Sequence, residues 1–164
     1  MSRFKSASLS AAWLALLVTG AGCIDTDTAV FVDATIDNAE ATVEEEALGI
    51  HLTGSFQLTL HLGARASGES SVTFGSFSLI DENDTVVVES LPVVSSEPAP
   101  FTVEPGGADT AVTFTIDTGV DLLPAEVKDA ICAGPVIVSG IIEDSLATTS
   151  TPVESEAFSA AGCN

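Results

Sequence analysis

Ser-Phe-Gln-Leu-Thr-Leu-His-Leu, residues 55–62, alternates without exception between polar and apolar side chains. Successive side chains of a β-strand point to opposite faces, so this pattern is typical of a strand with one buried face and one solvated face. Gly63 follows directly and is expected to end the strand. The stretch therefore predicts a β-sheet that packs one of its faces on a core.

Shorter runs of the same kind lie on both sides of this strand. Gly75 interrupts one run at a change of alternation phase, which predicts a β-bulge, and residues 81–84 form a turn that predicts a hairpin. Prolines in residues 91–105 indicate an edge strand or a loop, and Pro124 opens the one helical pattern. The further expected strands are residues 29–36, 72–79, 85–89, 112–116, 135–142 and 153–159.

This order of elements favours an all-β fold. Seven or eight short strands with turns between them, and one short helix near residues 124–131, predict an antiparallel two-sheet sandwich of immunoglobulin-like architecture. The sequence has no Cys…Trp…Cys signature, so the likeness is one of architecture alone. A small β-barrel is the alternative.

The composition is that of one acidic, folded domain. The chain has 164 residues, of which 46% are apolar, enough to bury a core. Its 24 Asp and Glu residues oppose 4 Lys and Arg residues, which gives a net charge of −20. A surface this negative repels phosphate backbones and offers no basic stripe, so we expect no nucleic-acid partner.

The N-terminal region has the layout of a secretory signal. Arg3 and Lys5 precede an apolar run, residues 11–18, and small residues then lead to Cys23. The apolar and small residues 11–22 are fewer than the roughly 17 to 25 that a transmembrane helix needs. We therefore predict no permanent spanning helix.

Residues 17–23, Leu-Val-Thr-Gly-Ala-Gly-Cys, resemble the lipobox of bacterial lipoproteins. Ala21, Gly22 and Cys23 match the family pattern, whereas Gly20 stands where Leu or Val is usual. The resemblance implies that residues 1–22 are removed as a signal peptide and that Cys23 carries a diacylglyceryl thioether and a further acyl chain. Cleavage near Gly22 by an ordinary signal peptidase is the alternative.

Lipidation would also set the organisation and the location of the chain. Residues 23–28 would be the lipidated Cys and a short tether, and residues 29–164 a single β-sandwich domain in the cell envelope, on the extracytoplasmic side of a membrane. The resemblance of Asp25 to an inner-membrane retention signal is incomplete, so the choice between inner and outer membrane is left open.

The number of cysteines supports this interpretation. Three cysteines in an exported chain leave one unpaired unless one has another fate. Lipidation of Cys23 leaves Cys132 and Cys163, which we expect to form a disulfide that fixes the C-terminus and contributes about 3 to 4 kcal/mol in the chain-entropy model. The alternative, Cys132 as a reactive nucleophile, has no His nearby in sequence.

Removal of the signal makes the chain more acidic and less aromatic. Only Arg65 and Lys128 then oppose all 24 carboxylates, so the net charge becomes −22. The signal takes the only Trp, and the sequence has no Tyr. Sugar-binding and peptide-binding surfaces usually depend on those two ring types, so an aromatic-platform lectin is disfavoured.

The sequence offers few groups for catalysis. His51 and His61 would lie about 33 Å apart on the polar face of one unbroken strand, too far to share a metal ion. Gly-x-Ser-x-Gly, Ser-x-x-Lys and glycine-rich phosphate-loop motifs are all absent. We therefore predict no enzyme activity. A third interpretation is a small hydrolase whose Ser, His and Asp side chains come together only in the folded chain.

A calcium site is the sharper hypothesis for the acidic residues. Asp81, Asn83 and Asp84 lie in one turn and carry the oxygen ligands that Ca²⁺ prefers. The turn begins like an EF-hand loop, but Val86 and Pro92 stand where that loop requires Gly and Glu, so an EF-hand is excluded. Calcium is the one cofactor that the sequence suggests. The alternative to a calcium site is a solvated acidic turn that maintains solubility.

Together these observations predict a non-catalytic lipoprotein, anchored in a membrane through Cys23, that serves as a binding or structural module. A protein partner in the cell envelope and the oligomeric state are left open. The alternative function is a calcium-dependent adhesion or ligand-binding β-sandwich.

Overall fold

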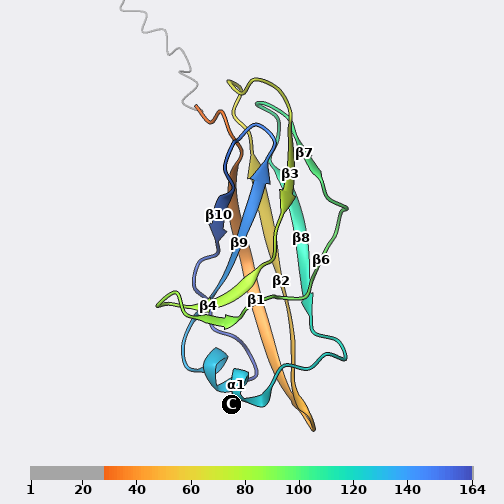
Figure 1. The fold of residues 1–164 in the computed structure, drawn as a ribbon, viewed down its shortest axis with the longest axis vertical. Coiled ribbons are helices and arrows are strands. Elements are labelled where there is room, and N and C mark those ends of the chain that lie inside the picture. The colour runs from red at the N-terminus through yellow and green to blue at the C-terminus, as the bar shows by residue number, and fades with distance from the viewer. Residues whose placement is uncertain (1–27, 164) are drawn as a thin grey trace, which may run out of the picture.

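The computed structural model describes residues 28–163, which contain ten strands and one short helix (Figure 1). They form two antiparallel sheets that face each other across one hydrophobic core. The elements are β1 (Asp33–Glu46), β2 (Gly49–His61), β3 (Ser70–Phe74), β4 (Ser78–Asp81), β5 (Val86–Val88), β6 (Val93–Ser95), β7 (Phe101–Val103), β8 (Thr110–Asp117), α1 (Ala125–Cys132), β9 (Val136–Asp144) and β10 (Thr151–Glu154).

The first sheet has the order β1-β2-β8-β6 and is built on the alternating stretch of β2. Phe56, Leu58 and Leu60 face the core and are at most 1% exposed, while the residues between them lie on the outer face. β1 follows β2 antiparallel from Asp33↔His61 to Glu46↔Gly49, with one extra residue between Asp37 and Glu40. This bulge resets the phase of β1, so its apolar side chains point inward on both sides of the interruption.

The second sheet is organised around β9. Ser139 pairs with β10 on one edge and with β4 on the other, and β3 continues β4 along that second edge. Phe74 pairs with Ile142 of β9 and Ser78 pairs with Ser139. The chain therefore advances four residues where β9 advances three, so one extra residue is inserted here. This is the bulge that Gly75 predicts, and the predicted hairpin through residues 81–84 is the β4–β5 pair.

Phenylalanine rings from both sheets meet at the centre of the core. Phe56 and Phe114 from the first sheet stack with ring centroids 5.0 Å apart, and Phe77 from the second sheet meets Phe56 edge-on at 4.8 Å. The ring of Phe77 lies directly over Gly140 of β9, where a Cβ atom would come within 2.3 Å of the ring. A glycine in the middle of β9 therefore makes room for the ring that the bulge turns inward.

The C-terminal strap, residues 155–163, joins the two sheets along one side of the sandwich. Its first part bonds to β9, where Phe158 and Val136 exchange two backbone hydrogen bonds of 2.8 and 2.9 Å. Its last part bonds to β1: the amide of Val43 donates to Ala161 at 2.9 Å, and the amide of Ala161 donates to Ala41 at 2.8 Å. The strap thus covers the edge of β1 that β2 leaves open.

The predicted antiparallel sandwich is confirmed, and the β-barrel alternative is wrong. The first sheet ends at β6 and the second at β5 and β7, so the strands of the described region do not close on themselves. The strand count is ten rather than seven or eight, because the expected strand 72–79 is divided into β3 and β4 and the proline-rich segment 91–105 contains two three-residue edge strands. β1 is also longer than expected, since it runs on past residue 36. The helix, predicted at residues 124–131, spans Ala125–Cys132.

We expect the substitution Gly140→Ala to lower the free energy of unfolding by about 1 to 3 kcal/mol, since the added methyl group overlaps the Phe77 ring. Gly68→Ala is the matched control, because nothing lies within 4 Å of a Cβ at Gly68. Denaturant unfolding followed by far-ultraviolet circular dichroism measures both. Equal stability of the two variants would contradict the packing of Phe77 on Gly140.

Candidate functional site

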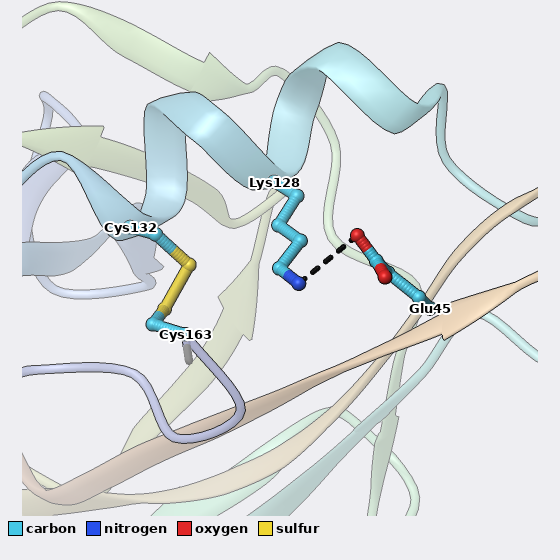
Figure 2. Close-up of a disulfide and its surroundings, with 4 residues drawn as sticks. All are labelled: Glu45, Lys128, Cys132 and Cys163. Atoms are coloured by element: carbon cyan, nitrogen blue, oxygen red, sulfur yellow. Dashed lines mark ion pairs between the residues drawn. A yellow bond between two sulfur atoms is a disulfide. The ribbon is translucent and has the colours of Figure 1, made fainter.

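The predicted site residues Cys132 and Cys163 lie together at the end of the molecule that carries α1 (Figures 1 and 2). Their sulfur atoms are bonded and their Cα atoms are 5.4 Å apart, so the last residue of α1 is joined to the strap. Nζ of Lys128, one turn earlier in α1, lies 3.0 Å from Oε1 of Glu45 in β1. Ile131 beside the disulfide is fully buried, so α1 is packed on the core at this end, where it is joined to the strap by the disulfide and to β1 by Lys128.

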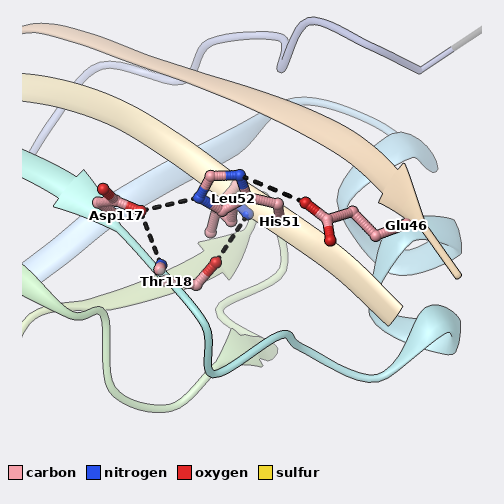
Figure 3. A network of polar contacts seen from close by, with 6 residues as sticks. Glu46, His51, Leu52, Asp117 and Thr118 are labelled. Carbon is pink, nitrogen blue, oxygen red and sulfur yellow. Dashed lines mark hydrogen bonds and ion pairs between the residues drawn. The ribbon is translucent and has the colours of Figure 1, made fainter. Parts of the chain in front are cut away.

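A histidine network lies near the same end of the first sheet (Figure 3). Nε2 of His51 in β2 is 2.8 Å from Oδ1 of Asp117 at the end of β8, and its Nδ1 is 4.0 Å from Oε1 of Glu46 at the end of β1. The backbone amide of Gly119 donates to the same Asp117 oxygen at 2.7 Å. The residues that follow His51 and Asp117 are also joined: the amide of Leu52 donates to the hydroxyl of Thr118 at 3.0 Å.

These contacts shift the pKa values of His51 and Asp117 in opposite directions. The hydrogen bond to Asp117 raises the pKa of His51; partial burial opposes this, and the negative charges of Asp117, Glu46 and Glu44 add to it. The hydrogen bonds from His51 and Gly119 lower the pKa of Asp117. Both shifts favour the charged forms, so the contact that links β2 to β8 favours an ion pair.

The network differs from a catalytic triad in one respect that matters for chemistry. A triad places a carboxylate on one ring nitrogen and a nucleophile's hydroxyl on the other. Here Asp117 bonds to one nitrogen of His51 and the carboxylate of Glu46 faces the other. The arrangement stabilises a protonated imidazole and does not prepare it to take a proton from a serine.

His61 lies at the opposite end of β2 and has its own carboxylate. Its Nδ1 is 2.6 Å from Oδ1 of Asp109. Since β2 runs unbroken between the two histidines, they are about 33 Å apart along the strand. The two rings therefore belong to separate contacts.

The acidic turn proposed for calcium uses its first carboxylate internally. Oδ1 of Asp81 accepts hydrogen bonds from the backbone amides of Asn83 and Thr85, both at 2.8 Å. The bonds from Thr85 and Asn83 lower the pKa of Asp81. Asp84 adopts a left-handed backbone conformation with φ 60°. Within residues 28–163, no group of three or more His, Cys, Asp or Glu side chains is arranged to hold a metal ion, so the calcium site at Asp81, Asn83 and Asp84 stays a prediction.

A buried carboxylate that the sequence analysis missed fastens the beginning of the domain. Asp144 is 6% exposed and accepts hydrogen bonds from the amides of Val32 and Leu146, each at 2.8 Å, and from the hydroxyl of Ser70. Burial by itself would raise the pKa of Asp144, but these hydrogen bonds outweigh it and the pKa is lowered. The alternation of β9 carries the signal, because Asp144 continues the inward phase of Val136 and its even-numbered successors.

Comparisons with protein-family models, with curated proteins and with solved structures find no match to this chain. Its function must therefore be argued from its own residues. The predicted lipidation site, Cys23, lies outside the described residues. In the described part, no helix has the length and apolar character needed to cross a bilayer.

The histidine network predicts a pH-dependent contribution to stability. Because the pKa of His51 is raised on folding, the contribution is fully present below the unfolded value of about 6.5 and is lost as pH rises through the folded value. We expect the difference in melting temperature between the native protein and His51→Gln to shrink between about pH 6 and about pH 9. Calorimetry measures it, and a difference that is constant or grows over this interval would contradict the ion pair.

The geometry of the acidic turn also predicts the response to calcium. Because Oδ1 of Asp81 is already bonded to its own turn, we expect millimolar Ca²⁺ to raise the melting temperature no more than Mg²⁺ at equal ionic strength. Calorimetry with each salt and with a chelator measures this. A Ca²⁺-specific rise of several degrees that Asp84→Asn abolishes would instead establish the calcium site.

Proposed function

We propose that the protein is a non-catalytic binding or structural module, held by lipid on Cys23 at the extracytoplasmic face of a membrane. The observation that carries the proposal is the placement of its two ends. The described chain begins at one end of the long axis, and α1 and the C-terminus lie at the other (Figure 1). A lipid at Cys23 would therefore hold one end at the membrane and leave the disulfide-bonded end furthest from it.

The length of the connection supports this orientation. Residues 24–28 separate Cys23 from the described domain and span at most about 18 Å when fully extended. At the near end, the buried Asp144 holds the amide of Val32 and so fixes the point where the chain joins the sandwich. A short tether on a fixed point keeps the domain beside the bilayer.

The side chains support a binding or structural role over catalysis. Both histidines are engaged by carboxylates on the outer face of the first sheet. A surface depression of about 440 Å³ beside β9 is lined by hydroxyl and carboxylate side chains, and neither His51 nor His61 lines it. Two cations against 24 carboxylates after signal removal favour a partner with a cationic surface.

The disulfide supports an extracytoplasmic location. Stable disulfides form in oxidising compartments, and the bond between Cys132 and Cys163 uses the two cysteines that lipidation of Cys23 would leave. The three cysteines thus have two complementary uses, one at each end of the domain.

The proposal is tested by the variant Cys23→Ala expressed in a bacterial host. We expect the native protein to incorporate labelled palmitate and to enter the detergent phase of a Triton X-114 partition, and Cys23→Ala to do neither. The matched control is the double variant Cys132→Ala, Cys163→Ala, which keeps the lipobox and should still be labelled. Acylation of Cys23→Ala, or its retention in the detergent phase, would contradict the proposal.

A further inference from the structure

The last five residues of the strap, 159–163, are held by few contacts. Four of them are exposed and only Ala160 is half-buried. Their backbone contacts with β1 are the two hydrogen bonds between Ala161 and residues 41 and 43. The disulfide of Cys163 in addition attaches them covalently to α1.

The chain immediately before these residues is anchored independently. Val153 in β10 is 4% exposed, and Phe158 packs against the core. Ser155 donates its amide to Val138 at 2.9 Å, and Phe158 exchanges two bonds with Val136. Loss of the disulfide would therefore free the end of the strap without removing the attachment at residues 153–158.

The disulfide at the strap's end joins one exposed residue and one half-buried residue. Cys163 is exposed, and Cys132 is half-buried at the end of α1. Next to Cys163, Gly162 has φ 80° and lies so close to β1 that a Cβ would come within 2.0 Å of the carbonyl oxygen of Val43. The seat of the strap on β1 thus depends on close backbone contact with little side-chain burial.

We propose that the Cys132–Cys163 disulfide is a redox latch: its reduction releases residues 159–163 from β1 and uncovers the backbone edge of β1 at residues 41–43, while the sandwich stays folded. This inference does not depend on lipidation of Cys23. The uncovered amide of Val43 and carbonyl of Ala41 would then be unpaired groups on a strand edge.

The chemistry is a thiol–disulfide exchange with a dithiol reductant. One thiolate of the reductant attacks the sulfur of Cys163, the S–S bond breaks, and the sulfur of Cys132 leaves as a thiolate that takes up a proton. The second thiol of the reductant then displaces Cys163 as a thiol. The protein gains two electrons and two protons, and the reductant becomes a disulfide.

Amide hydrogen exchange, measured by NMR on the folded full-length protein in detergent before and after dithiothreitol, tests the latch. We expect protection of the amides of Val43 and Ala161 to fall at least tenfold on reduction. The amides of Leu52 and Phe158, which bond to Thr118 and Val136, should change less than twofold. A uniform fall at all four amides, or unchanged protection at Val43, would overturn the proposal.

A second variant separates the strap's seat from the cysteine chemistry. Gly162→Ala should lower the protection of Val43 by a similar factor while mass spectrometry shows the disulfide intact, because the methyl group overlaps the carbonyl of Val43. Gly134→Ala is the matched control beside Cys132, with nothing within 4 Å of its Cβ. Undiminished protection of Val43 in Gly162→Ala would contradict the contact on which the latch depends.

Discussion

The contact of Phe77 with Gly140 is the constraint on which the sandwich depends. The bulge after Phe74 turns Phe77 toward the first sheet, and Gly140 leaves the space that its ring fills. There the ring meets Phe56 and Phe114, so both sheets are held to a single spacing at their centre. Clustered aromatic rings bury large areas and pack in specific geometries, which fixes the position of the two sheets relative to each other. The outer faces are then free to carry the many carboxylates.

The two ends of the sandwich are fastened by different chemistry. At the end where the chain begins, the buried carboxylate of Asp144 collects the amides of Val32 and Leu146. At the other end, the disulfide and the Lys128–Glu45 ion pair hold α1 against β1 and the strap. Lys128 and Arg65 are the only Lys and Arg side chains in the described residues, and the pairing of Lys128 with Glu45 places attractive charge where strands, helix and strap converge. The lipid proposed on Cys23 would hold the first end at the membrane and present the second end to a partner.

The sequence predicted the sandwich well because its core strands alternate cleanly, as in β2, and because Gly75 and the turn at 81–84 mark a bulge and a hairpin. It missed the length of β1, since the bulge at Asp37–Glu40 breaks the alternation that would reveal a strand. The pairing of His51 with Asp117 depends on β2 lying beside β8, a non-local contact that no local pattern encodes. The strap was missed for the same reason: residues 159–163 carry no strand pattern, and their place is set by β1 and by the bond at Cys163.

The three cysteines divide between two uses: a lipid proposed on Cys23 and the disulfide between Cys132 and Cys163. Mass spectrometry of the intact protein purified from membranes without reductant, followed by peptide mapping, tests that division most directly. We expect an N-terminal peptide that begins at Cys23 and carries a diacylglyceryl group and an acyl chain, together with one peptide pair linked through Cys132 and Cys163. An unmodified Cys23, or a disulfide that joins Cys23 to either of the other cysteines, would contradict it.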